Sequence, residues 1–371
     1  MSNIELQQAE DAQKIDQGVR EEIHRDHSAT ILFAIQHPAH VHLFQNSIRI
    51  LSQNGYDVHV FARKKEINTD LLDLLEIDYE LLAGEINKSW QMPFVQFKYE
   101  WGIIRKTRQL NPDVLVAVGE PAITHAAKLT DATSLVFTDT EHATLQNILA
   151  FPFADYIHTP ECYQEDIGPK QRRYPGYHEL AYLHPDRFEP DPSILDEVGL
   201  DRTEQFVVLR LVSWDAMHDV GQNGFEDIVD AVDAIEETGA RVLITSEADL
   251  PPAIVDRQVS IPPHRIHDLL AFADLYIGES ATMTAESAVL GTPAVYISSL
   301  RTGYTDELEK KYGLVFTYPE AGQHERGLKK AIEILNQNSS RKWETRRQRM
   351  LMDKKDTTDV ILTSILESVE Q

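Results

Sequence analysis

The sequence predicts an α/β protein with two domains, each built around a parallel β-sheet. Its 371 residues exceed the roughly 150 that are typical of one domain. Short runs rich in Val, Ile, Leu and Phe show little polar alternation, which is typical of strands buried on both faces of a parallel sheet. Amphipathic stretches separate these runs, as the helices of βαβ units do.

The first half of the chain contains the strands and helices of one such domain. The apolar runs predict strands at 30–36, 57–62, 112–119 and 134–139, and the amphipathic stretches predict helices at 40–54, 93–110 and 121–130. Gly55 ends the first of these helices. Before them, residues 1–28 are polar and lack the apolar core of a signal peptide, so we expect a loosely ordered extension or one peripheral helix.

A turn-rich, proline-bearing segment at 174–193 predicts the linker between the two domains. The rhythm then repeats, with strands expected at 205–211, 240–246, 273–278 and 293–298 and helices at 224–237, 264–272, 281–290 and 304–312. Two helical stretches, at 321–352 and 357–369, close the chain. We therefore expect a first domain at 29–185, a second at 186–340, and C-terminal helices at 341–371 that cross back to the first. Ligands should lie at the carboxyl ends of the strands.

The charge balance excludes one large class of partner. The chain carries 35 basic and 60 acidic residues, a formal net charge of −25. Duplex DNA or RNA requires clustered Lys and Arg against the phosphates, so a nucleic-acid surface is not expected. Cys162 is the only cysteine, which excludes an internal disulfide and a cysteine-based zinc site and favours a reducing, cytoplasmic setting. No apolar run is long enough for a membrane span.

The most informative motif occupies residues 273–298. A strand ends at Gly278, Ser280 stands where a side-chain oxygen caps a helix, and the free amides of that helix start can bind an anion. Glu286 follows almost two turns later, where a carboxylate suits the paired hydroxyls of a ribose. From the spacing alone, a capped βαβ unit whose glutamate faces water is the simpler interpretation.

The segment GESATMTAESAVLGTP (278–293) resembles the donor-nucleotide signature of the GT-B superfamily, which holds nucleotide-sugar glycosyltransferases and the non-hydrolysing UDP-N-acetylglucosamine 2-epimerases. The resemblance implies a GT-B fold of two Rossmann-like domains that face a central cleft. It assigns the diphosphate to Ser280, Ala281 and Thr282 and the ribose to Glu286. The stretch 260–274 resembles the segment lining the base pocket, which makes His264 and Arg265 candidates there.

Four further candidates lie in the second half. Arg210 ends a strand and is well placed to neutralise a diphosphate, although an interdomain salt bridge is an equal alternative. The segment LRTGYTDEL (300–308) resembles the epimerase loop that carries Arg, Thr and Glu against sugar and phosphate. That resemblance places Arg301, Thr302 and Glu307 at the nucleotide sugar.

The loop after the first strand contains His37, His40 and His42. GT-B transferases place a Gly/His loop here, so His40 is a candidate general base on an acceptor hydroxyl, a task that suits imidazole near neutral pH. Three histidines within six residues also allow metal binding, but this spacing is a weak ligand pattern. Interaction with the helix dipole or simple packing is the plainer alternative, and we expect no bound metal.

Two carboxylates follow later strands of the first domain. Glu120 takes the place of the aspartate in the Gly-Asp-Thr of the resembled epimerases, and Glu141 matches the position of their catalytic glutamate. Buried carboxyls could pass protons to and from a sugar. For any one of these residues alone, capping of the next helix is the better interpretation. Asp139 and Glu141 also resemble the Asp-x-Asp metal motif of another transferase superfamily, but the resembled GT-B sites work without metal.

Three segments resemble most closely an archaeal and bacterial family of unassigned function within this superfamily: ILFAIQHPAHVHLFQN, YHELAYLHPDRFEPD and GESATMTAESAVLGTP. The sequence departs from the epimerases because their Gly-Thr-Arg-Pro-Glu loop and His-Arg-Arg-Glu run are absent. The base-and-phosphate half of the epimerase pattern is thus present, and the sugar half is incomplete.

The expected function is a metal-independent glycosyltransferase that uses a nucleotide-sugar donor, needs no cofactor, and makes precursors of surface glycans, glycolipids or glycoproteins. A nucleotide-sugar 2-epimerase with Glu120 and Glu141 as acid and base is the first alternative, and a non-catalytic nucleotide-sugar-binding regulator is the second. The basic stretch 341–355, beside Trp343, Met350 and Leu351, suggests peripheral contact with the inner face of a membrane. A solvated helix face is the preferred interpretation of that stretch.

Overall fold

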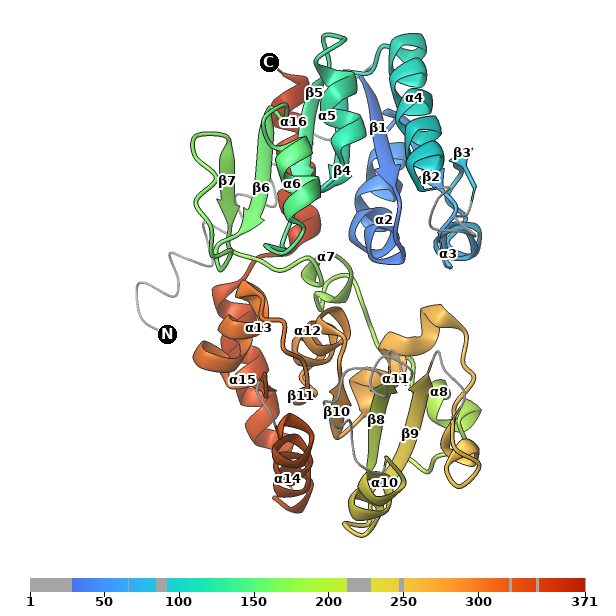
Figure 1. Ribbon diagram of the computed structural model, residues 1–371, viewed down its shortest axis with the longest axis vertical. Helices are drawn as coiled ribbons and strands as arrows, with labels where there is room; N and C mark the ends of the chain where they lie inside the picture. The colour runs from blue at the N-terminus through green and yellow to red at the C-terminus, as the bar shows by residue number, and fades with distance from the viewer. Residues whose placement is uncertain are drawn as a thin grey trace. The chain divides into compact units, whose positions relative to one another are not determined.

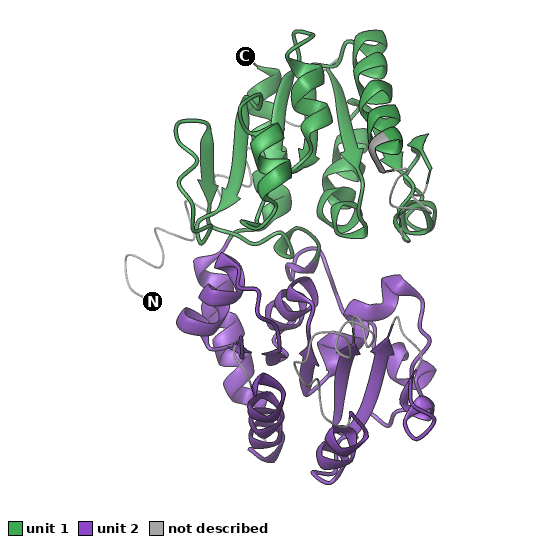
Figure 2. Cartoon of the chain, viewed as in Figure 1, with its two compact units in different colours: residues 1–182, 355–371 green, residues 183–354 purple. Residues whose placement is uncertain are grey.

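A computed structural model of the chain describes residues 29–65, 67–84, 92–211, 228–246, 250–319, 322–337 and 340–370. It forms two compact units, residues 1–182 with 355–371 and residues 183–354 (Figure 2). The expected N-terminal extension at 1–28 and the loop that follows Arg210 lie outside the described residues.

Unit 1 contains a seven-stranded parallel sheet of order β3-β2-β1-β4-β5-β6-β7 (Figure 1). Its strands are β1 (Thr30–Ile35), β2 (Asp57–Arg63), β3 (Glu80–Ala83), β4 (Val114–Val118), β5 (Thr133–Phe137), β6 (Tyr156–Pro160) and β7 (Gln171–Tyr174). Its helices are α2 (Pro38–Gln53), α3 (Asn68–Leu74), α4 (Met92–Leu110), α5 (Pro121–Ala127), α6 (Thr144–Ala150), α7 (Leu180–Leu183, at the unit boundary) and α16 (Thr357–Val369).

Both faces of this sheet are covered, which explains the apolar runs of its strands. Leu32 and Ala34 of β1 share a buried cluster with Tyr99 of α4 and Ala122 of α5. Phe33, which points to the other face, meets Phe44 of α2 at 5.4 Å between ring centroids. The last helix, α16, packs against α2, β4 and β5 on this second face, so the end of the chain belongs to unit 1.

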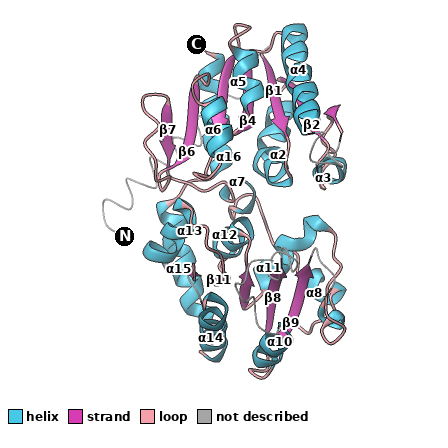
Figure 3. Cartoon of the chain, in the orientation of Figure 1, coloured by secondary structure: helices cyan, strands magenta, loops and turns pink. Residues whose placement is uncertain are grey.

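Unit 2 contains a five-stranded sheet of order β12-β11-β10-β8-β9, again parallel (Figure 3). The strands are β8 (Phe206–Leu211), β9 (Arg241–Ser246), β10 (Leu275–Gly278), β11 (Ala294–Tyr296) and β12 (Val315–Thr317). The helical segments are α8 (Ser193–Glu197), α10 (Ile228–Glu236), η2 (Val255–Arg257), η3 (Pro263–Arg265), α11 (Ile266–Phe272), α12 (Ala281–Leu290), α13 (Gly303–Glu307), the π-helical turn η4 (Leu308–Tyr312), α14 (Gln323–Asn336) and α15 (Ser340–Asp353). The two parallel sheets confirm the predicted fold class.

The basic helix α15 is held against unit 2. Trp343 and Met350 are buried, and Arg347 donates from Nε to the carbonyl of Val289, at 3.0 Å, near the end of α12. Arg346 donates to the carbonyl of Gly313. The prediction that Trp343 and Met350 could rest on a membrane is therefore wrong, because both side chains pack inside the unit. Within the described part of the chain, no helix is both long and apolar enough to cross a membrane.

Candidate functional site

The carboxyl ends of β1, β4 and β5 bring several polar side chains of unit 1 to one edge of the sheet. These three strands are neighbours, so the loops that leave them lie next to one another. His40 stands in the first turn of α2 after β1, Glu120 follows β4, and Asp139 follows β5. The structure thus brings the predicted residues His40 and Glu120 to a common edge.

His40 is a neutral imidazole. Burial and the neighbouring charges of His37, His178 and Lys65 lower the pKa of His40 to about 3, against the opposing effect of Asp139. The Nδ1 atom of His40 accepts from the backbone N–H of Gln36 at 3.4 Å, which leaves the ring proton on Nε2. A side chain with so low a pKa is a weak proton acceptor.

Glu120 is a buried carboxyl group. Its Oε1 accepts from the backbone N–H of Ala122 at 3.1 Å and caps α5, as the simpler interpretation predicted. Burial and the charge of Glu100 raise the pKa of Glu120 to about 7, although the Ala122 amide, Arg63 and Gln96 oppose this. A carboxyl with this pKa can both donate and accept a proton near neutral pH.

Asp139 and His178 form a half-buried pair that no sequence pattern predicted. The Nδ1 atom of His178 lies 3.1 Å from Oδ2 of Asp139. Although burial raises the pKa of Asp139, the charge and hydrogen bond of His178 outweigh it and lower that pKa. The Nε2 atom of His178 is buried and has no hydrogen-bond partner among the described residues. This arrangement fixes the tautomer of His178 and leaves Nε2 as an available proton acceptor.

Glu141 has a different environment. Its Oε1 accepts from the backbone N–H of Gln164 at 3.1 Å. It lines a cavity of about 580 Å³ between α6 and the segment 165–170, together with Asn147 and Lys170. No three His, Cys, Asp or Glu side chains of the described residues come together in a way that would hold a metal ion.

In unit 2, the turn after β10 has the geometry expected of an anion site. Ser280 caps α12, with its hydroxyl accepting from the N–H of Met283 at 3.3 Å, and Ala281 and Thr282 form the first turn. Gly278 stands where a Cβ atom would lie 2.4 Å from the Tyr276 hydroxyl, so only glycine fits. The backbone of Gly278 pairs in register with Arg210, whose strand β8 lies beside β10.

Glu286 and Arg265, two predicted ligand contacts, are both paired within unit 2. The carboxylate of Glu286 is buried and lies 2.9 Å from Nε2 of His267. Arg265 contacts three carboxylates, those of Asp191, Glu197 and Asp268. The contacts of Arg265 anchor the segment 191–197 to η3 and α11. The contact between Glu286 and His267 joins α12 to α11.

His264, beside Arg265 in η3, has a buried Nδ1 atom without a hydrogen-bond partner among the described residues. This leaves His264 with a ring nitrogen that a bound base could engage, so its predicted role as a base contact stays a prediction.

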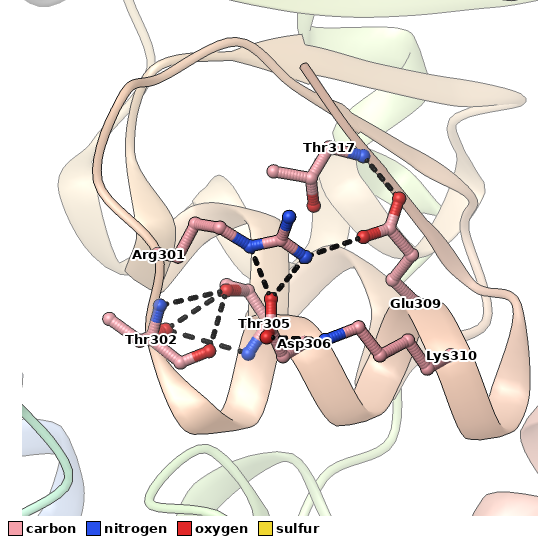
Figure 4. A network of polar contacts seen from close by, with 7 residues as sticks. All are labelled: Arg301, Thr302, Thr305, Asp306, Glu309, Lys310 and Thr317. Carbon is pink, nitrogen blue, oxygen red and sulfur yellow. Dashed lines mark hydrogen bonds and ion pairs between the residues drawn. The ribbon is translucent and has the colours of Figure 1, made fainter. Parts of the chain in front are cut away.

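The segment that resembles the epimerase sugar loop is a tight internal network (Figure 4). Nε of Arg301 donates to Asp306 at 2.7 Å, and Nη2 donates to Glu309 at 3.2 Å. Thr302 and Thr305 cap α13 reciprocally. Glu307 pairs with the buried Lys354 at 2.7 Å. The structure therefore shows a stabilising function for these side chains, and their contact with a sugar stays a prediction.

Several solved structures have a fold similar to that of this chain. A UDP-GlcNAc 2-epimerase from Neisseria meningitidis, solved with UDP-GlcNAc bound, matches at 12% identity and a TM-score of 0.65, over 92% of this chain and 99% of that one. The epimerase from Methanocaldococcus jannaschii matches at 13% and 0.63, over 84% and 94%. The glycosyltransferase VinC, solved with dTDP, matches at 14% and 0.62, over 92% and 99%.

These likenesses show the fold alone: the chain has the GT-B fold, as the sequence predicted. An uncharacterized protein from Methanocaldococcus jannaschii is 23% identical over 271 residues, which cover 69% of this chain and 78% of the relative. A family model described as "Protein of unknown function (DUF354)" matches residues 30–370.

Proposed function

Because the chain belongs to the DUF354 family and has the GT-B fold, we propose that it is a metal-independent glycosyltransferase with a nucleotide-sugar donor. It would make precursors of surface glycans, glycolipids or glycoproteins, and it would act in the cytoplasm. The observation that carries the proposal is the Asp139–His178 pair, because transfer to a hydroxyl needs a positioned base.

Unit 1 would activate the acceptor. The Nε2 atom of His178 would take the proton of the acceptor hydroxyl while Nδ1–H stays bonded to Asp139, whose carboxylate stabilises the resulting imidazolium. We assign this function to His178 rather than to His40, since a pKa of about 3 makes His40 a weak base and its Nδ1 already accepts from the Gln36 amide. His40 would instead lie beside the hydroxyl as a neutral donor through its Nε2–H.

Unit 2 would bind the donor. The bond between the anomeric carbon and the diphosphate oxygen breaks as the acceptor oxygen attacks, so negative charge grows on the diphosphate. The amides of Ala281 and Thr282 at the start of α12, with Arg210 on the neighbouring strand, would stabilise that charge. No step in this scheme requires a metal or another cofactor.

The second candidate is a nucleotide-sugar 2-epimerase. The pKa of Glu120, raised to about 7 mainly by burial, favours it, because such a carboxyl could remove and return a proton at a sugar carbon. Glu141 would supply the second carboxylate.

One experiment separates these readings. The protein is incubated with a panel of UDP-, GDP- and dTDP-sugars in deuterium oxide, with and without hydroxyl acceptors, and the products are analysed by NMR and mass spectrometry. Acceptor-dependent release of the nucleotide, abolished in His178→Gln and retained in Glu120→Gln, supports the transferase. Deuterium at C2 without an acceptor supports the epimerase and refutes the transferase. Binding without any turnover supports a regulator and refutes both enzymes.

A further inference from the structure

Helix α4 of unit 1 exposes large aromatic side chains to solvent. Phe94 is 71% exposed, Phe97 is 70% exposed and Trp101 is 57% exposed. Their spacing of three and four residues places them on one face of the helix. Single apolar residues are common on protein surfaces, but a contiguous exposed apolar patch is uncommon. An exposed aromatic row of this kind therefore indicates a surface that binds a partner.

Basic side chains continue the same face. At 100° per residue, the outward side chains fall within an arc of about 100°. This α4 face consists of Phe94, Phe97, Lys98, Trp101, Arg105 and Arg108, all exposed. The opposite side of the helix carries Tyr99, Ile103 and Thr107, all buried against the sheet.

The acidic residue of α4 itself is paired with a neighbouring helix. Glu100, the only acid in α4, bonds to His125 of α5. Lys106 leans toward β3, where it pairs with Glu80. The helix holds four basic residues and one acidic residue, whereas the whole chain has a net charge of −25. The α4 face is therefore a positively charged region on a negatively charged protein.

A second apolar patch lies on the same layer of helices. The α6 helix exposes Leu145, Ile148 and Leu149. Between α4 and α6, His125 of α5 contacts Glu100 through one ring nitrogen and the carbonyl of Leu149 through the other. α4, α5 and α6 therefore form a continuous layer over one face of the sheet (Figure 1).

We propose that unit 1 docks on an anionic phospholipid surface through the α4 face. Aromatic rings rest at the level of the headgroups, while Lys98, Arg105 and Arg108 contact the lipid phosphates. The charge of the chain selects this occupant: a second copy would bring another −25 and an identical row of bases, whereas an anionic bilayer complements the bases and accepts the rings. The proposal does not depend on the nucleotide-sugar activity.

The α4 face also replaces the basic helix α15 as the membrane candidate. In α15 Trp343 and Met350 are buried and Met352 is exposed, so the helix offers exposed charge without an aromatic row. In α4 both kinds of side chain share one exposed arc, which is the combination that interfacial helices present.

The test is flotation with vesicles of phosphatidylglycerol and phosphatidylcholine, compared with vesicles of phosphatidylcholine alone. We expect the full chain to float only with the anionic vesicles, and less at high salt. Lys98→Gln/Arg105→Gln/Arg108→Gln should weaken binding at least tenfold, since each base near the surface contributes roughly a factor of five. The matched control, Arg341→Gln/Lys342→Gln/Arg349→Gln, removes three exposed bases from α15 and should bind like the parent.

A second variant tests the rings. Phe94→Ser/Phe97→Ser/Trp101→Ser should also lose flotation, with an unchanged circular dichroism spectrum because these side chains are exposed. Equal loss in the α15 control, or no binding of the parent chain to anionic vesicles, would overturn the proposal. A parent chain that is dimeric and becomes monomeric in the serine variant would also overturn it, because the α4 face would then join two copies.

Discussion

Substitution of Glu120 by Gln should remove a large pH effect on the free energy of unfolding. Burial raises the pKa of Glu120 from 4.5 to about 7 in the folded state. Between these values the folded chain holds a proton that the unfolded chain has lost, so the stability of the parent falls as pH rises from 4.5 to 7. At about 1.4 kcal/mol per pH unit, the displacement amounts to roughly 3 kcal/mol. The glutamine does not titrate, and its Oε1 can still accept from the Ala122 amide.

The assay is urea unfolding of both proteins at intervals from pH 4.5 to pH 8. Near pH 4.5 the two free energies of unfolding should be similar, and by pH 8 the variant should be more stable by roughly 3 kcal/mol. Asp155→Asn in the same unit is the control. Burial raises the pKa of Asp155, but hydrogen bonds from Lys128 and Ser134 outweigh burial and lower that pKa. The contribution of Asp155 to the free energy of unfolding therefore changes only below pH 4.5. If the free energies of unfolding of the parent and Glu120→Gln differ by the same amount at every pH, the pKa of Glu120 is not raised by burial.

Two further substitutions test the packing of unit 2. Gly278→Ala should lose about 1–3 kcal/mol of stability, because the new Cβ would lie 2.4 Å from the Tyr276 hydroxyl oxygen; an additional Tyr276→Phe should return part of this in urea unfolding, and no loss in the alanine variant would contradict the contact. Glu307→Gln should cost about 3–5 kcal/mol, because it leaves the ammonium of Lys354 buried beside a neutral amide. In thermal unfolding Lys354→Met should cost much less, and equal losses in the two variants would show that the buried charge of Lys354 is not the cause.

The sequence predicted most of the buried strands but missed β6, which lies inside the first sheet and is largely buried. β1, β2, β4, β5, β8, β9, β10 and β11 all match apolar runs. The segments that were missed include edge strands such as β7, whose residues QRRY carry charges because one side is open, and short strands such as β12. The long helical stretch predicted at 321–352 corresponds to two helices, α14 and α15, since amphipathic spacing continues through both.

The candidate site was predictable only where its residues follow one strand. His40 and Glu120 were found because each stands at the carboxyl end of an apolar run. Asp139 and His178 are 39 residues apart and meet only because the segment after β7 returns to the end of β5. No local sequence pattern predicts that these two residues pair. The α4 face was also missed, because aromatic residues at helical spacing ordinarily indicate a buried side.

The start of α12 is the proposed binding site for the diphosphate of a nucleotide sugar, and isothermal titration calorimetry with UDP-, GDP- and dTDP-sugars measures this binding. Thr282→Glu places a carboxylate in the first turn of α12, which suits the helix but repels a diphosphate. Gln323→Glu makes the same change in the first turn of α14. We expect the parent and Gln323→Glu to bind one of these ligands alike, and Thr282→Glu to bind it at least tenfold more weakly. No binding by the parent, or equal binding by all three proteins, would contradict it.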